Sequence, residues 1–138
     1  MTDDAARYAR RSTVAGALLM FTGLVLGALG THYVAHRVTP GRLASWETAV
    51  LYQLLHGLGL VLLGVLARTT AYTRWLAWAG GLMLGGVLLF SGSICLATAG
   101  LEHATRAAPT GGTMLMVAWI LVAAHVWRGH RPGHSGAT

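Results

Sequence analysis

The sequence predicts an all-α integral membrane protein in which four transmembrane helices form a compact bundle. Apolar residues make up 54% of the 138-residue chain, whereas charged residues make up only 10%. Between the charges lie four neutral stretches of 20 or more residues, which are Ser12–His36, Thr48–Ala67, Trp75–Leu101 and Ala107–Trp127. A helix of ~20 residues crosses a ~30 Å hydrocarbon core, so four such stretches leave almost no chain for a soluble domain.

Each neutral stretch predicts one membrane-spanning helix inside a transmembrane domain that covers residues 12–128. The helices are expected near residues 13–35, 44–66, 75–99 and 109–128. The first stretch exceeds the 7–15 apolar residues of a signal peptide, so we expect it to be retained. Residues 1–11 form a basic cytoplasmic segment, and the polar tail 129–138 has the composition of a disordered segment.

The arginines predict the orientation in a bacterial-type inner (plasma) membrane. All ten basic residues are arginine, and the net charge is +6. One side of the membrane would hold seven of them, which are Arg7, Arg10, Arg11, Arg68, Arg74, Arg128 and Arg131. The other side would hold only Arg37, Arg42 and Arg106. The positive-inside rule therefore places both termini in the cytoplasm. Because these arginines flank the spans, they indicate membrane topology and contact with lipid, and we expect no nucleic-acid partner.

Small residues in the spans predict close contact between helices. Gly23 and Gly27 form a GxxxG motif in the first span, and Gly81 and Gly85 form another in the third. Small residues at this spacing let helix backbones approach closely in lipid. They indicate tight packing, within the chain, in a homo-oligomer or against another membrane protein. The two outer loops also share Gly, His, Arg and Pro in the same order, which is compatible with two duplicated helical hairpins.

The second span carries polar groups that need partners inside the membrane. Tyr52, Gln53 and His56 are neighbours on one helix face because they are three and four positions apart. They are expected to face the bundle interior and to meet Ser91 or Ser93 of the third span. One interpretation is a polar site for a proton, ion, quinone or lipid headgroup. The other is a set of interhelical hydrogen bonds that fixes packing.

Other polar and aromatic residues suggest local contacts. Glu47 lies nine residues before His56, which places it on the opposite side of the helix and roughly 13.5 Å away along the axis, so it cannot share that site. We expect it to pair with His32 at the outer interface. Trp119 falls within the fourth span and is expected inside the bundle. The histidines His125, His130 and His134 lack the tight Cys/His spacing of a structural zinc site, so no metal is predicted.

Four blocks of sequence resemble the small membrane family called domain of unknown function 423, to which the transmembrane protein 256 group belongs. They are Gly27–His32, Trp46–His56, Leu89–Ser93 and Ala108–Gly112. The family usually has Ala-His-Gly where this chain has Thr31-His32-Tyr33, so the helix end there is expected to differ. The resemblance implies a four-helix membrane fold and draws attention to the polar residues named above. It implies no substrate.

These observations favour a non-enzymatic membrane protein without a cofactor. The chain has four acidic residues and no nucleophile elbow or phosphate loop, so hydrolytic and phosphoryl-transfer chemistry is not expected. The first hypothesis is an accessory or assembly component of a membrane complex, or a homo-oligomer. The alternative is a small carrier or ligand-binding protein with an intramembrane polar site around His56.

Overall fold

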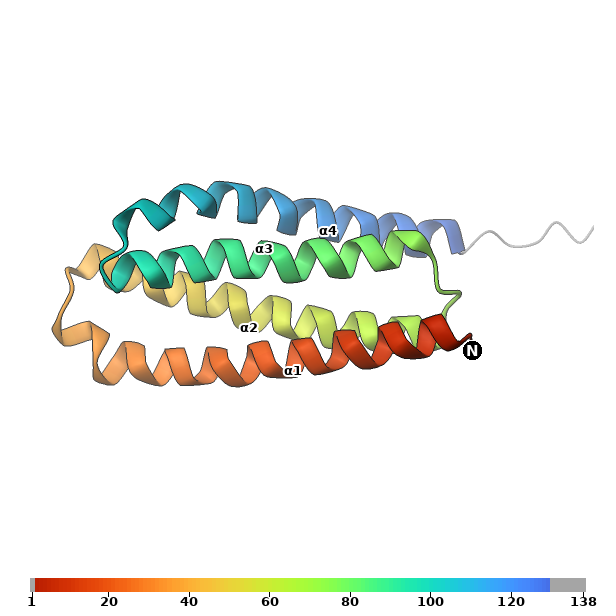
Figure 1. Cartoon of the computed structure of the whole chain (residues 1–138), viewed down its shortest axis with the longest axis horizontal. Coiled ribbons are helices and arrows are strands. Elements are labelled where there is room, and N and C mark those ends of the chain that lie inside the picture. Colours follow the sequence, from red (N-terminus) through yellow and green to blue (C-terminus); the bar gives the residue numbers. More distant parts are fainter. Residues whose placement is uncertain (1, 130–138) are drawn as a thin grey trace, which may run out of the picture.

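The computed structural model describes residues 2–129, which form four long helices joined by short connections (Figure 1). The helices are α1 (Asp3–His32), α2 (Pro40–Thr69), α3 (Arg74–Thr98) and α4 (Ala108–Gly129), and two short 3₁₀ helices are η1 (Val34–His36) and η2 (Glu102–Ala107). All four long helices have the length and apolar composition to cross a membrane. The prediction of an all-α fold with four spans is confirmed. The tail from residue 130, with its predicted disorder and with His130 and His134, lies outside the described residues.

The helices α1 and α2 begin well before their neutral stretches. The segment 1–11, predicted as a separate basic segment, is helical from Asp3 onward. Thr2 caps this helix, because its hydroxyl accepts a hydrogen bond from the amide of Ala5 at 3.3 Å. Asp3 and Asp4 in the first turn add negative charge next to the positive end of the helix dipole. The α2 helix likewise begins with Pro40 at its first position, where the missing N–H costs nothing.

The α3 helix ends next to a glycine whose backbone conformation other residue types rarely adopt. Gly100 has φ +110°. Its amide donates to the carbonyl of Ala97 at 3.2 Å, and the amide of Leu101 donates to the carbonyl of Leu96 at 3.0 Å. This is a Schellman arrangement, which satisfies the last carbonyls of a helix. It turns the chain into η2.

The four helices are packed as two hairpins joined along one side. α1 runs along α2, α3 runs along α4, and α2 contacts α3 (Figure 1). Within the described residues, α4 makes no backbone contact with α1 or with α2. The start of α1, the α2–α3 connection and the end of α4 lie at the same end of the molecule. We call this the arginine-rich end, since it holds six described arginines, namely Arg7, Arg10, Arg11, Arg68, Arg74 and Arg128.

The core follows the lines where α2 and α3 meet their neighbours. Its fully buried side chains include Leu60 of α2 and Leu76, Met83 and Val87 of α3. Many large apolar side chains point outward instead, such as Phe21, which is 64% exposed. In a bilayer this exposure has no hydrophobic cost, because lipid tails are as apolar as the side chains. The outer faces of the helices are therefore suited to lipid.

Close packing of α1 on α2 occurs at Gly16, Gly57 and Gly64. A methyl group added at Gly16 would collide with the carbonyl of Gly57 and lie 2.9 Å from the amide nitrogen of Val61. The predicted motif in α1 is also at this interface. A methyl group at Gly23 would lie 2.8 Å from a methyl of Leu54, while one at Gly27 would find only ordinary contact.

The predicted motif in α3 is not a packing motif within the part of the chain that the structure describes. Nothing lies within 4 Å of a methyl group added at Gly81, and one at Gly85 would meet only the terminal methyl of Met114. The close contact is made instead by Gly86, next to Gly111 of α4. Gly81 points away because the buried face of α3 contains residues 76, 79, 80, 83 and 87. The spacing of glycines alone does not specify this rotation.

Candidate functional site

Gln53 is buried and joins α2 to α1. Its side-chain nitrogen donates to the carbonyl of Leu19 at 3.1 Å and to the hydroxyl of Thr22 at 2.7 Å. The prediction that the group of Tyr52, Gln53 and His56 contacts Ser91 or Ser93 is therefore wrong for Gln53. Gln53 lies on the side of α2 that packs against α1, where polar carbonyl and hydroxyl groups are available.

The two serines of α3 have other surroundings. Ser93 is buried and donates to the carbonyl of Phe90, three residues earlier in its own helix, at 2.9 Å. Ser91 is 1% exposed, and its hydroxyl has no hydrogen-bond partner within the described residues. Neither serine forms a hydrogen bond with α2. The predicted polar cluster is thus divided among separate environments.

His56 is 7% exposed, and only one of its ring nitrogens has a partner. Nδ1 lies 2.7 Å from the carbonyl oxygen of Tyr52. A carbonyl can only accept, so Nδ1 carries the hydrogen, and in the neutral ring Nε2 is left as an acceptor. Nε2 makes no hydrogen bond to any described residue.

The rings of Tyr52 and Trp119 lie near the imidazole of His56, and the ring of Phe90 lies against that of Tyr52. The ring centroids of Tyr52 and Phe90 are 4.7 Å apart, and those of Tyr52 and His56 are 5.7 Å apart. The ring of Trp119 lies 6.2 Å from that of His56. Trp119 was expected inside the bundle, but it is 44% exposed. Tyr52, also expected to face the interior, is 37% exposed.

These residues line a groove of about 610 Å³ on the surface of the helix bundle. Its walls are α2 and α4, and Phe90 of α3 lies between them. The lining residues are Tyr52, Leu55, His56, Leu58, Gly59, Leu62, Phe90, Gly112, Leu115, Met116 and Trp119. The groove exists because α2 and α4 make no backbone contact with each other in the described part of the chain. The hydropathy pattern gave no sign of this gap.

The groove combines flat apolar surfaces with few polar side-chain groups, which are the Nε2 of His56, the hydroxyl of Tyr52 and the indole N–H of Trp119. An imidazole nitrogen without a partner in apolar surroundings favours a ligand that supplies a donor. The lining contains no carboxylate, lysine, serine or cysteine. Such a site can hold a ring or a chain and orient one hydroxyl group.

The predicted pair of His32 and Glu47 is not formed. Both side chains are exposed, and the described residues show no ion pair or hydrogen bond between them. The α1–α2 hairpin is held there by Trp46, whose indole N–H donates to the carbonyl of Leu26 at 3.0 Å. A methyl group at Gly30 would lie 2.7 Å from that nitrogen, so glycine makes room for the indole.

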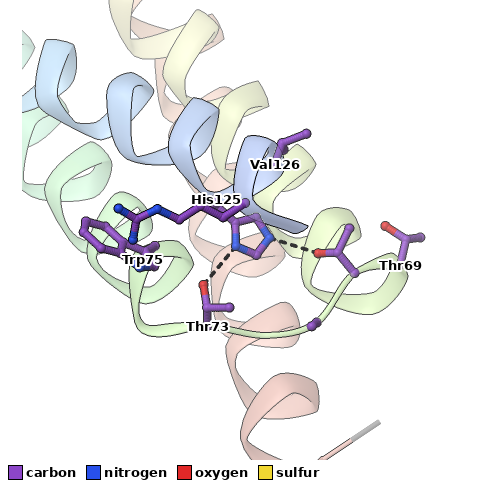
Figure 2. A pocket seen from close by; sticks show the side chains of 8 residues that line it. Thr69, Thr73, Trp75, His125 and Val126 are labelled. Carbon is purple, nitrogen blue, oxygen red and sulfur yellow. Dashed lines mark hydrogen bonds between the residues drawn. The ribbon is translucent and has the colours of Figure 1, made fainter. Parts of the chain in front are cut away.

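His125 near the end of α4 is a polar residue whose role sequence reasoning missed. It is 5% exposed, and its two ring nitrogens contact the hydroxyls of Thr70 and Thr73 at 3.0 and 2.9 Å (Figure 2). His125 was considered only as a metal ligand. Within residues 2–129 no three His, Cys, Asp or Glu side chains are close enough to hold a metal ion. A histidine inside an apolar span opposite a Thr-rich loop was the available signal.

Together, the four apolar helices define a small polytopic membrane protein. The model of the family described as "Protein of unknown function (DUF423)" matches residues 26–112. The chain belongs to this family, and the resemblance inferred from its sequence blocks is confirmed.

Bacterial relatives support the same assignment. A UPF0382 membrane protein of Staphylococcus haemolyticus is 34% identical over 110 residues, which cover 79% of this chain and 88% of the relative. The UPF0382 membrane protein YwdK of Bacillus subtilis is 31% identical over 110 residues, covering 79% and 89%. One from Staphylococcus saprophyticus is 33% identical, covering 79% and 90%. No solved structure matches the chain.

Proposed function

We propose that this membrane protein binds a lipid-soluble molecule in the groove between α2 and α4, without catalysing a reaction on it. The observation that carries the proposal is the Nε2 of His56, which has no hydrogen-bond partner among the described residues and lies in a groove lined by aromatic rings. A flat ring bearing a hydroxyl, as in a quinol, fits this chemistry. The ring would lie among Tyr52, Phe90 and Trp119, and its hydroxyl would donate to His56.

A binding role is favoured over catalysis because the groove supplies little reactive chemistry. Its ionisable residues are Tyr52 and His56. The four acidic residues of the chain, Asp3, Asp4, Glu47 and Glu102, are exposed near the helix ends. Apart from Tyr52, the lining holds no side chain that could act as a base or nucleophile together with His56.

Titration with a benzoquinol carrying a short alkyl tail tests this proposal. The probe should bind the detergent-solubilised protein, and its dimethyl ether should bind about fivefold more weakly, which is the effect of losing one hydrogen bond of about 1 kcal/mol. His56→Phe, which keeps a ring but removes the acceptor, should remove the difference between the two compounds. His32→Phe is the matched control, because His32 is exposed and does not line the groove. Equal binding of quinol and ether to the wild type would refute the proposal.

A second candidate function is that of an accessory component in a membrane complex or a homo-oligomer. It is favoured by an exposed face of α3. A methyl group added at Gly81 or Gly92 on this face would meet no described atom within 4 Å. Trp78 and Leu88 on the same helix are 67% and 57% exposed. Backbone approach at such a face is a common mode of helix association in lipid.

Substitution on this face separates the two candidates. Gly81→Leu should dissociate a partner or homo-oligomer in mild detergent while leaving the unfolding temperature of the isolated chain unchanged. The mass of the purified particle, measured by light scattering, reports the result. A wild-type protein that is monomeric and free of protein partners would contradict the accessory role.

We further propose that the arginine-rich end faces the cytoplasm of a bacterial plasma membrane. Six described arginines at this end against three at the other support the orientation. In a Cys95→Ser background, Thr105→Cys should react with an impermeant thiol reagent added to intact cells, and Ala71→Cys should react only after lysis. The reverse labelling pattern would refute the orientation.

A further inference from the structure

The α2–α3 connection, together with the end of α4, forms a second pocket, which shares no lining residue with the groove at His56. Its volume is about 500 Å³, and Figure 2 shows its side chains. The lining residues are Thr69, Thr70, Ala71, Thr73, Trp75, His125, Val126 and Arg128. Hydroxyl groups, an imidazole and a guanidinium therefore surround one cavity at the arginine-rich end.

The hydrogen bonds of His125 fix the wall of this pocket. The hydroxyl of Thr70 donates to the carbonyl of Leu66 at 2.9 Å, so it accepts from Nε2–H of His125. Nδ1 of the neutral ring then accepts from the hydroxyl of Thr73. Both ring nitrogens are satisfied, and His125 holds α4 against the connection. Its role in the pocket is to position the neighbouring residues.

Arg128 supplies a cation that has no counter-ion within the described residues. Its guanidinium carbon lies 4.6 Å from the centroid of the Trp75 ring, which holds the side chain over the pocket rim. The described ion pairs are Arg7 with Asp4 and Arg42 with Glu102, so neither involves Arg128. The acids at this end, Asp3 and Asp4, lie on α1, which makes no backbone contact with α4.

We propose that this pocket binds the phosphate group of an anionic phospholipid from the adjacent leaflet. The guanidinium of Arg128 can donate two parallel hydrogen bonds to phosphate oxygens, whereas the hydroxyls of Thr70 and Thr73 already donate within the protein and shape the wall of the pocket. Basic pockets at the ends of transmembrane helices are suited to anionic headgroups. The rim also contains Val126, which is 49% exposed, and the ring of Trp75. These apolar surfaces favour a phosphate attached to acyl chains over free phosphate.

Lipid titration of the purified full chain in neutral detergent tests the site. Phosphatidylglycerol should raise the unfolding temperature in a saturable way, whereas phosphatidylcholine and inorganic phosphate at equal concentration should not. Arg128→Gln should weaken the apparent affinity for phosphatidylglycerol by about tenfold or more, as expected for a lost charge-assisted hydrogen bond. Arg128→Lys should give an intermediate loss, because it keeps the charge but loses the fork of donors.

Arg10→Gln is the matched control, since it removes one exposed positive charge from the same end without altering the pocket. Its effect should stay below about twofold, because exposed charges are screened by solvent. An equal loss in Arg10→Gln and Arg128→Gln would mean that total charge, not the pocket, attracts the lipid. A response to inorganic phosphate equal to that for phosphatidylglycerol would overturn the assignment to a lipid. This test involves no residue of the α2–α4 groove, so its outcome is independent of the proposed function.

Discussion

The side-chain nitrogen of Gln53 in α2 lies 2.7 Å from the hydroxyl oxygen of Thr22 in α1. The Thr22 hydroxyl donates to the carbonyl of Leu18 in its own helix at 2.8 Å, so it accepts from Gln53. This bond assigns Gln53 to the packing of the α1–α2 hairpin. His56, only three residues later, is left to the groove on another side of α2. Two nearby residues of α2 thus have different roles, because Gln53 packs against α1 and His56 lines the candidate ligand site.

The first prediction concerns this interhelical bond. Gln53→Leu should lower the free energy of unfolding by about 0.6 kcal/mol and by no more than about 1.7, the range measured for hydrogen bonds between helices in membranes. Thr22→Val tests the same bond from the other side. Unfolding in mixed micelles should show that the double variant loses less than the two single variants combined. Strict additivity would mean that the bond contributes nothing.

The second prediction compares two glycines. Gly16→Ala should destabilise the protein by about 1–3 kcal/mol, because the added methyl collides with backbone atoms of Gly57 and Val61 that cannot move freely. Gly81→Ala is the control, since nothing lies within 4 Å of its added methyl. It should be neutral or slightly stabilising, as alanine favours helix. Unfolding temperatures in detergent provide the measurement, and equal effects would show that the α1–α2 contact is looser than described.

The third prediction uses two buried serines with opposite hydrogen-bonding states. Ser91→Ala should raise the stability by about 1 kcal/mol, because it removes a buried hydroxyl without a described partner. Ser12→Ala should lower the stability by a similar amount, since the Ser12 hydroxyl donates to the carbonyl of Leu60 at 2.7 Å. The sign of the difference in unfolding free energy is the result to measure. A loss of stability in Ser91→Ala would reveal a partner for that hydroxyl.

The fourth prediction concerns the brace at the arginine-rich end. His125→Phe should keep the helices folded but release the hydroxyls of Thr70 and Thr73. Amide hydrogen exchange in residues 69–74 should then become faster, because the connection loses its contact with α4. His103→Phe, at the exposed opposite end, should leave exchange in this segment unchanged. Unaltered exchange in His125→Phe would show that other contacts hold the connection.

The sequence by itself determined the fold class, the number of spans and their approximate limits. These follow from the length of the neutral stretches, because the thickness of the hydrocarbon core sets the length of a helix that crosses it. The polar groups at Gln53 and His56 were also recognised as buried, since a polar side chain loses hydrogen bonds when it faces lipid. The four sequence blocks were sufficient to indicate the family.

Only the tertiary structure decided which polar and small residues meet. The rotation of each helix about its axis assigns Gln53 to α1, leaves Gly81 without a neighbour and leaves Ser91 without a described hydrogen-bond partner. That rotation depends on the complementary shapes of facing helices, and a spacing of three or four residues does not encode it. The groove at His56 and the brace at His125 likewise join residues from different helices. Such contacts are properties of the packed helices together, because lipid gives little hydrophobic preference for one pairing of helices over another.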